Sequence, residues 1–472
     1  MTSRIIHGRE DVDVVLVNPP YERHLVRGNV HYTASPLGLA YLSAVLKGEG
    51  FSVRGYDFCT GFTSMYDALQ EISKHNPRVV GVSLNSMGLR FAHIFFKSIR
   101  ERMPDVITIA GGPHVTVDPE VIFDLGVDYG LRGESEEDLV KLCGNVLRGE
   151  AFGERGGVFS GKDREDVGCP SIIRNIDDIP FPDRGLFDDS AYKFQSMVLS
   201  RGCPFQCSYC GMAGTEFRQR GLDNVMDEMK TLASKGFASV EFADDVFTLD
   251  KDYVIRLCER MMEGKLGFTW SCTTRTDLVD EELLKAMRDA GCRYISFGVE
   301  SGVEHIRYSL GKKIPNETYS DIFSECRRIG IKTRAYGMLG HPGETLKDME
   351  DTIAFINSLN PNNVLYTPTI IFPGTRLMEY CVRNNIIEPD AWRQYMNGLR
   401  TRPIFIPEGI SPETLEKTIW RAYNSFYLRP QFIKERLIEA RSISDVVRAG
   451  VLTTALIGER VYKTGDRSRY VR

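Results

Sequence analysis

The sequence has no apolar run of the roughly 18 residues that a membrane-spanning helix needs. It also has no long basic run, and its 59 Lys and Arg against 64 Asp and Glu leave a net charge of −5. Such a balance argues against a nucleic-acid partner. Charged residues between Arg9 and Asp13 interrupt the start of the chain, so no apolar signal segment opens it. We therefore expect a cytoplasmic protein without a transmembrane segment.

Paired cysteine motifs are missing as well. Eight of the 11 cysteines stand alone, and no C-x2-C or H-x3-H pair accompanies the remaining three. In a reducing compartment we expect isolated cysteines to be small core residues and not disulfide partners. These eight are Cys59, Cys143, Cys169, Cys258, Cys272, Cys292, Cys326 and Cys381.

The other three cysteines form a C-x3-C-x2-C triplet within RGCPFQCSYCG, residues 201–211. Cys203, Cys207 and Cys210 follow a strand-like segment at 197–200. Three thiolates on one tight loop can hold one face of an iron–sulfur cluster, which leaves one iron open to another ligand. A zinc site that lacks its fourth ligand and a chance grouping are the alternatives.

This spacing, with Tyr209 just before the third cysteine, resembles the radical SAM superfamily. The resemblance implies that Cys203, Cys207 and Cys210 ligate a [4Fe-4S] cluster whose open iron binds S-adenosylmethionine (SAM). Reductive cleavage of SAM would then yield a 5′-deoxyadenosyl radical. An electron donor of the flavodoxin or ferredoxin type would be required.

At 472 residues the chain is long enough for two or three domains. Residues 1–150 alternate short β-branched strands with helices, which predicts a doubly wound parallel sheet. We expect one helix to be capped by Ser35 and Pro36, and another by Ser135 with Asp138 three residues later. The expected strands lie near residues 13–18, 51–56, 79–84, 106–110 and 127–131.

Ligands of such sheets bind at the carboxyl ends of the strands, which here carry small residues. The segments VNPP, SPLGLAYLSAVLKGEG, AGGPHVT and LRGESEE resemble the cobalamin-binding domain that precedes the barrel in a subgroup of radical SAM enzymes. The resemblance implies cobalamin contacts at Ser83, Gly111, Gly112 and Gly133. Tight turns at these glycines, and a domain that binds no cobalamin, are the alternatives.

Two nucleotide or cofactor motifs are absent from this half of the sequence. No G-x-G-x-x-G follows the first strand, which disfavours a dinucleotide site. The D-x-H-x-x-G motif that supplies a lower histidine ligand to cobalt in methionine-synthase-type domains is also absent. Cobalamin would then bind without that ligand, and His114 is expected to be a loop or packing residue.

Residues 151–193 are rich in Gly, Pro and Asp and read as a linker. Residues 194–400 repeat a strand–helix unit six times, which resembles the open (βα)6 barrel of radical SAM enzymes. Residues 401–472 predict a helical C-terminal region, with an apolar helix at 446–457 that packs on the protein or docks on a membrane surface. The barrel strands are expected near 197–200, 238–243, 268–274, 293–299, 332–339 and 363–371.

The barrel resemblance also assigns SAM contacts. It places Asp244 or Asp245 at the SAM amino group, Glu300 at the ribose and Gly340 near the adenine. Arg275 could pair with the SAM carboxylate. The alternatives are that the two aspartates cap the next helix, that Glu300 and Arg275 pair with each other, and that Gly340 only forms a turn.

These features predict a cobalamin-dependent radical SAM methyltransferase that acts on an unactivated carbon of a small-molecule, natural-product or lipid-type substrate. No catalytic acid or base can be named. A cobalamin-dependent cyclase, oxidase or carbon-joining enzyme is the main alternative. A tRNA methylthiotransferase is less favoured, because residues 1–150 hold only Cys59 and Cys143. A non-enzymatic cobalamin or redox sensor is the last alternative.

Overall fold

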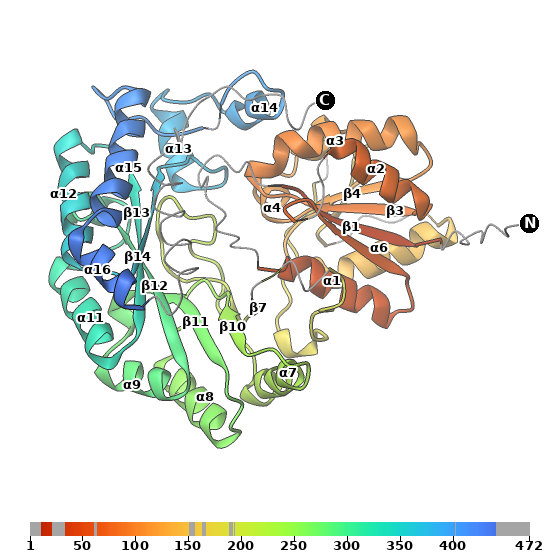
Figure 1. The fold of residues 1–472 in the computed structure, drawn as a ribbon. Helices are drawn as coiled ribbons and strands as arrows, with labels where there is room; N and C mark the ends of the chain where they lie inside the picture. Colours follow the sequence, from red (N-terminus) through yellow and green to blue (C-terminus); the bar gives the residue numbers. More distant parts are fainter. Residues whose placement is uncertain are drawn as a thin grey trace, which may run out of the picture.

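The computed structural model describes residues 11–20, 34–60, 64–150, 156–162, 167–187, 192, 194–401 and 403–439. Its strands form two six-stranded sheets and one two-stranded ribbon. Figure 1 shows the N-terminal sheet and its helices beside a second, curved sheet whose helices cover the outer face. The expected pair of α/β units, a doubly wound sheet and a partial barrel, is therefore present.

The N-terminal sheet has the strand order β2-β1-β3-β4-β5-β6. Its first five strands are parallel, and each apolar run is buried because helices cover both faces. The sixth strand, from the predicted linker, adds antiparallel to β5 at the sheet edge. The strands are β1 (Val14–Asn18), β2 (Val53–Asp57), β3 (Val79–Ser83), β4 (Ile107–Gly111), β5 (Tyr129–Leu131) and β6 (Val158–Ser160). The helices are α1 (Leu37–Gly48), α2 (Met65–Lys74), α3 (Leu89–Arg102), α4 (Pro113–Val117), α5 (Val121–Leu125) and α6 (Glu136–Arg148).

The second sheet is all-parallel, with the order β14-β13-β12-β11-β10-β7, and it contains all six expected barrel strands. Alternate residues such as Val240 and Phe242 lie in the hydrophobic core formed with the helices. The strands are β7 (Gln195–Met197), β10 (Ser239–Phe242), β11 (Thr269–Thr274), β12 (Cys292–Glu300), β13 (Lys332–Leu339) and β14 (Asn363–Pro368). The covering helices include α7 (Leu222–Ser234), α8 (Lys251–Glu263), α9 (Glu281–Asp289), α10 (Glu304–Ser309), α11 (Asn316–Ile329) and α12 (Leu346–Ser358).

The C-terminal helices follow the last barrel strand. They are α13 (Arg376–Arg383), α14 (Ala391–Met396), α15 (Pro412–Tyr427) and α16 (Pro430–Glu439). Helix α15 packs against β14, and α14 packs against α3 of the N-terminal unit. The Tyr423 hydroxyl accepts a hydrogen bond from the Tyr366 N–H and donates one to the Tyr366 carbonyl, so α15 satisfies the open edge of β14. The predicted helix at 446–457 lies outside the described residues.

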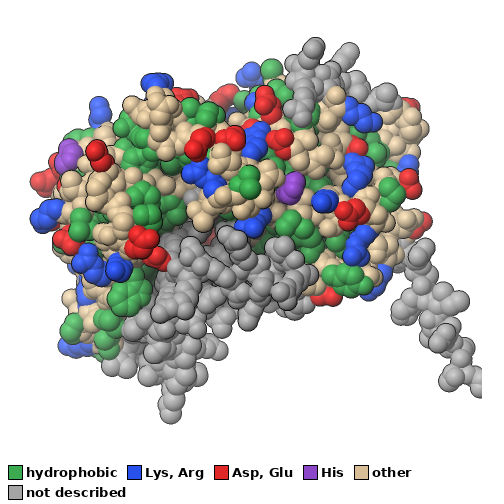
Figure 2. All heavy atoms as spheres, turned by 90° about the horizontal axis from the view of Figure 1, so that it is seen from above, with side chains coloured by type: hydrophobic (Ala, Val, Ile, Leu, Met, Phe, Trp, Pro, Cys, Tyr) green, Lys and Arg blue, Asp and Glu red, His purple; other side chains and the backbone are tan. Residues whose placement is uncertain are grey.

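Two expectations concern the whole chain: that it has no transmembrane segment and that it binds no nucleic acid. None of the described helices combines the length and apolar character that crossing a membrane requires. Figure 2 shows acidic and basic side chains interspersed over the face that it presents.

Two of the predicted N-terminal caps are wrong. Helix α1 begins at Leu37 with Pro36 in the cap position, and no side chain bonds to its first N–H groups. Ser135 stands at the cap of α6 but makes no capping bond; its hydroxyl donates to the Gly133 carbonyl instead. The Asp138 carboxylate accepts hydrogen bonds from the Gly157 N–H and the Ser171 hydroxyl, so contacts with the linker replace the local cap.

The first barrel helix also begins without a side-chain cap. Asp223 lies inside α7 and pairs with Arg260. The N–H of Gly221, at the cap position, donates to Asp177 of the linker at 2.8 Å. A carboxylate distant in sequence therefore anchors the residue at which α7 starts.

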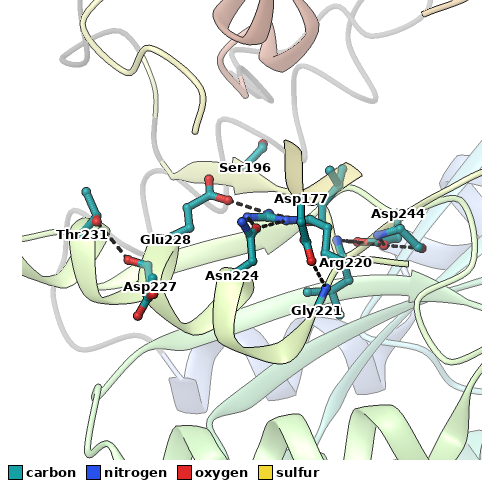
Figure 3. Close-up of polar contacts among 12 residues, drawn as sticks. Asp177, Ser196, Arg220, Gly221, Asn224, Asp227, Glu228, Thr231 and Asp244 are labelled. Carbon is teal, nitrogen blue, oxygen red and sulfur yellow. Dashed lines mark hydrogen bonds and ion pairs between the residues drawn. The ribbon is translucent and has the colours of Figure 1, made fainter. Parts of the chain in front are cut away.

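A buried charge network joins the linker to the barrel. Glu228 on α7 receives Arg184 of the linker at 2.5 Å and Arg220 at 2.6 Å, one guanidinium on each carboxylate oxygen. Figure 3 shows Glu228 and Asn224 directed toward Arg220 from the same helix. Arg220 also donates to Asn224, and all three charged side chains are almost fully buried. Buried charges of this kind are tolerated because each is paired and hydrogen-bonded.

Glu228→Gln is therefore expected to leave two buried guanidinium groups without a counter-charge. Breaking a buried pair of this type costs about 3–5 kcal/mol, which should lower the thermal unfolding midpoint markedly. Asp227→Asn is the matched control, because Asp227 is the preceding residue and makes only an exposed pair with Lys230. The control should change stability by less than about 0.5 kcal/mol. Equal midpoints for the two variants would contradict the role given to Glu228.

Candidate functional site

The cysteine loop leaves and re-enters the barrel through a short antiparallel ribbon, β8 (Ser200–Arg201) and β9 (Arg218–Gln219). Gly202 opens the loop with φ +90°, and a Cβ there would lie 2.0 Å from the Glu216 carbonyl oxygen. Only glycine fits that approach. The Cys203 N–H donates to the Thr215 hydroxyl at 2.9 Å, which closes the base of the loop.

Backbone N–H groups already point at two of the three sulfurs. The Met212 N–H donates to Cys210 Sγ at 3.4 Å, and the Phe205 N–H hydrogen-bonds to Cys203 Sγ. Burial raises the pKa of both thiols, and the neighbouring Cys207 raises it further. A bound metal would stabilise the thiolate form and so offset the cost of burying its charge. Hydrogen bonds from N–H groups to sulfur are a feature of cluster ligation.

The three cysteines lie on one loop, with Cys203 and Cys210 both near Cys207. Across the described part of the chain, no three His, Cys, Asp or Glu side chains gather closely enough to hold a single metal ion. A cluster offers each thiolate its own iron, so three cysteines on one loop supply the ligands that three of its irons need.

The loop is held across the carboxyl end of the barrel by two other connections. The Ser208 N–H donates to the Leu310 carbonyl at 2.9 Å, and the Leu377 N–H of α13 donates to the Ser208 carbonyl at 2.8 Å. A Cβ at Gly311 would lie 2.5 Å from the Gln206 carbonyl, so the loop packs on that connection without a gap. The cysteines consequently sit over the strand ends, where a barrel carries its active site.

The two candidate aspartates have different environments. Asp244 is buried and accepts hydrogen bonds from the Leu199 N–H, the Ser200 N–H and the Ser200 hydroxyl, and burial raises its pKa to about 6. Asp245 is exposed and accepts one bond from the Gly202 N–H beside the cysteines. Neither caps the following helix, because Asp250 caps α8, so that alternative is wrong.

Glu300 ends β12 in a left-handed conformation, with φ +65°. This conformation is uncommon outside glycine and is typical of functional sites. Its carboxylate pairs with Lys312 at 3.2 Å and hydrogen-bonds to the Tyr209 hydroxyl in the cysteine loop. Lys312 also donates to the Gly298 carbonyl at 2.6 Å. The cysteine loop and the end of β12 are thus joined through one carboxylate.

Arg275 does not pair with Glu300, so the predicted alternative of a mutual pair is wrong. Its guanidinium forms a two-point ion pair with Asp277, at 2.9 and 2.7 Å, and lies 3.7 Å from the ring centroid of Phe205. This stacking places Arg275 against the cysteine loop from the end of β11. Its charge is partly balanced by Asp277 before any substrate binds.

Gly340 follows β13 with φ +90°. Its N–H and that of His341 donate to one carboxylate oxygen of Glu344, at 2.6 and 2.9 Å. The other oxygen of Glu344 is buried and has no hydrogen-bond partner in the described structure. The glycine therefore forms the predicted turn, and the turn is organised around a buried carboxyl group.

The glycines at the edge of the N-terminal sheet contact protein. Gly112 has φ +94°, and a Cβ there would lie 2.9 Å from the Leu84 backbone and the Ser83 hydroxyl. A Cβ at Gly133 would lie 2.3 Å from the Ser171 carbonyl of the linker. The Gly111 carbonyl accepts the Leu84 N–H at 2.7 Å. The tight-turn alternative thus accounts for these glycines.

The first turn of α1 is open by comparison. It has no side-chain cap, and nothing in the described structure lies within 4 Å of a Cβ at Gly38. Uncapped N–H groups at the carboxyl edge of a parallel sheet can hydrogen-bond to a polar ligand. The first turn of α1 therefore presents N–H groups without a side-chain cap at this edge.

His114 is a packing residue, as expected. Its Nδ1 hydrogen-bonds to the Ser86 hydroxyl at 2.8 Å, and its ring lies edge-on to Trp392 of α14. Burial lowers its pKa to about 3, so the ring is neutral. The side chain is enclosed between the two domains and does not reach a ligand on an open surface.

Several residues around the loop are not identifiable from the sequence. No role for Lys312 or Phe205 follows from the sequence. Lys312 pairs with Glu300 at the end of the preceding strand, and Phe205 stacks on Arg275 from the end of β11. For Glu344 the sequence gives only a weak indication of a role: it directly follows the turn segment that contains Gly340 and Gly343. The sequence also does not indicate that Asp277 would pair with Arg275.

Burial of Glu344 raises its pKa from 4.5 to about 7, which has a consequence for stability. Between these pH values the folded protein keeps a proton that the unfolded chain releases, so stability should fall as pH rises through this window. The loss should total about 3 kcal/mol. Unfolding midpoints of Glu344→Gln measured from pH 4.5 to 8 should lack that fall, whereas Glu350→Gln on the exposed face of α12 should retain it. A wild-type profile for Glu344→Gln would contradict the assignment.

Comparisons with known proteins agree with this architecture. The family model described as the radical SAM superfamily matches residues 197–356, and the B12 binding domain model matches residues 23–142. An uncharacterized methyltransferase of Pyrococcus horikoshii is 31% identical over 440 residues, which cover 90% of this chain and 95% of the relative. The anaerobic magnesium-protoporphyrin IX monomethyl ester cyclase of Rubrivivax gelatinosus is 26% identical, with 89% of this chain and 78% of the cyclase covered.

A solved structure shares the whole fold. The radical SAM methyltransferase TsrM of Kitasatospora setae, solved with cobalamin and a [4Fe-4S] cluster, superposes with a TM-score of 0.71 at 18% identity. The match covers 95% of this chain and all of that chain. With the two family models and the Pyrococcus relative, it identifies this chain as a member of the radical SAM superfamily, in the group that carries a B12-binding domain before the barrel.

Proposed function

We propose that this radical SAM enzyme transfers a methyl group to an unactivated carbon of a small-molecule substrate. The observation that carries the proposal is the position of the cysteine loop, which contacts the carboxyl edge of the N-terminal sheet through Arg201 and Glu136 at 2.7 Å. The two cofactor-binding units of the family thereby adjoin each other. The methyltransferase relative at 31% identity supports methylation over other outcomes.

The proposed domains are 1–150 for cobalamin, 151–193 as the linker, 194–400 as the radical SAM barrel and 401–472 as the C-terminal region. Cys203, Cys207 and Cys210 are the proposed cluster ligands. When bound, the cluster with SAM supplies a 5′-deoxyadenosyl radical, and cobalamin supplies the methyl group.

The residues of this chain would bind and orient SAM. Asp245 is the better candidate for its amino group, because both oxygens of Asp244 are already occupied by backbone N–H groups. Glu300 is proposed for the ribose, Gly340 for the adenine and Arg275 for the carboxylate. Each lies at the carboxyl end of a barrel strand, so the contacts would close over one site.

Cobalamin is proposed to lie on the carboxyl edge of the N-terminal sheet, against the open first turn of α1. Ser83, Gly111, Gly112 and Gly133 shape that edge by allowing the loops to pack closely, and their proposed role is to form the cradle. His114 is enclosed, with its ring against Ser86 and Trp392, which supports binding without this residue as a lower ligand.

The substrate is proposed to be a natural product or lipid-type molecule, and the reductant a flavodoxin or ferredoxin in the cytoplasm. Interspersed surface charges support the absence of a nucleic-acid partner. A cobalamin-dependent cyclase or oxidase is the second candidate, since the Rubrivivax relative is named as a cyclase.

Replacing Cys203, Cys207 and Cys210 together by alanine should abolish cluster assembly, because no thiolate would remain to hold the irons. After anaerobic reconstitution with iron and sulfide, the variant should lose its bound iron, its visible absorbance and SAM cleavage. Cys169→Ala is the control, because Cys169 is an exposed free cysteine outside the loop, and it should retain all three properties. A triple variant that keeps its iron would reject the ligand assignment.

The mass of the product separates the two candidate functions. Incubation of the reconstituted, cobalamin-loaded enzyme with SAM, a reductant and extracts of its source cells should give a product heavier by about 14 Da. SAM with a deuterated methyl group should shift that product by about a further 3 Da, since the methyl carbon carries the label. A product lighter by about 2 Da and free of label would instead establish cyclisation or oxidation.

A further inference from the structure

Four charged residues join the N-terminal sheet to the two ends of the cysteine loop, and we refer to them as the interdomain clasp. Glu134 and Glu136 follow β5 at the carboxyl edge of the N-terminal sheet. Arg201 immediately precedes the loop and Arg218 immediately follows it. The two arginines face each other in the antiparallel ribbon of β8 and β9, so they present their charges from one place.

The contacts within the clasp are close and reciprocal. Arg218 pairs with both carboxylate oxygens of Glu134, at 2.7 Å each, and also donates to the Ile173 carbonyl of the linker. Arg201 pairs with Glu136 at 2.7 Å and lies 3.6 Å from Glu134. Glu134 therefore lies between both arginines, and the two-point pair with Arg218 fixes its direction.

The clasp is largely shielded from water. Its four side chains are between 8% and 19% exposed, which excludes them from the class of weak surface pairs. Burial opposes the charge of Glu134, yet hydrogen bonds from Arg218 and the Ile173 N–H hold its pKa below the ordinary value. Burial would lower the pKa of Arg201, but Glu136 raises it. Glu134 is therefore charged at neutral pH.

A separate contact holds the two domains together. Trp392 and Tyr395 of α14 lie in the same hydrophobic cluster as the helices of the N-terminal sheet, and Arg393 pairs with Asp118 and Asp124. The Tyr395 hydroxyl donates to the Met87 carbonyl at 3.2 Å. Because this apolar contact already secures the domains, the clasp is not needed for their association.

We propose that the interdomain clasp is a positioning device that fixes the cysteine loop relative to the carboxyl edge of the N-terminal sheet. Among the described residues, its contacts with the barrel are made at the two ends of the loop. Resting on the proposed function, its role would be to set the separation between the cluster and cobalamin. A displacement of about 1 Å at such a centre can lower the rate a hundredfold, so a fixed loop position would matter for catalysis.

The test uses the full chain, reconstituted with iron and sulfide and loaded with hydroxocobalamin. Arg218→Ala and Glu134→Gln break the clasp, Arg218→Lys keeps its charge without the two-point geometry, and Glu134→Arg with Arg218→Glu reverses the pair. Arg328→Ala is the control, because Arg328 makes exposed ion pairs on the outer barrel helices. Two readouts are hydrogen exchange of residues 202–217 and the magnetic interaction between the reduced cluster and cob(II)alamin.

Breaking the clasp should speed exchange of the loop amides by about tenfold and alter the magnetic interaction, beyond what the accompanying fall in the unfolding midpoint produces elsewhere in the chain. The lysine variant should be intermediate. The reversed pair should behave like the broken clasp, because it would set a positive charge at position 134 beside Arg201 and leave the Ile173 N–H without its acceptor. Unchanged loop exchange in Arg218→Ala and Glu134→Gln, or an equal change in the control, would overturn the proposal. If the wild-type protein takes up no cobalamin, the proposed function fails, and the exchange measurement still decides the role of the clasp.

Discussion

Pairing of buried charges is the constraint on which this structure depends. The chain buries arginines at the joints around its cysteine loop, and each is stable there only because a carboxylate meets it. Glu228 joins the linker to the barrel through Arg184 and Arg220, and Glu134 joins the N-terminal sheet to the loop through Arg218. These pairs specify geometry, because a guanidinium and a carboxylate match in direction as well as in charge.

The second consequence is that the working edges of two parallel sheets adjoin. Parallel α/β sheets bind ligands at the carboxyl ends of their strands, so a protein that uses two such sheets for one reaction must bring both edges together. Here Met87 and His114, from the edge of the first sheet, contact Tyr395 and Trp392 of the segment that follows the last barrel strand. The cysteine loop lies beside this junction, held to the first sheet by the clasp.

The residues that the family resemblance selects divide into two groups in space. One group contacts only other parts of the protein. In it, Asp244 accepts hydrogen bonds from the backbone, and Gly112 and Gly133 allow two backbone segments to approach closely. Arg275 and Glu300 touch side chains of the cysteine loop and remain beside the proposed SAM site. A residue that the family resemblance selects can therefore serve the site by shaping the backbone around it, without contacting a ligand.

Local periodicity and the spacing within one loop are enough to predict the strand–helix alternation, the six barrel strands and the cysteine triplet. Contacts in the folded chain decide that Asp177 meets the start of α7, which partners Arg275 and Lys312 take, and that the LRGESEE turn meets the two ends of the cysteine loop. Some of those pairs join residues tens of positions apart. In others, several residues of the same charge are available as partners. The local sequence does not specify which partner a charged group takes, because burial and distance in the folded chain decide which charges lie close enough to interact.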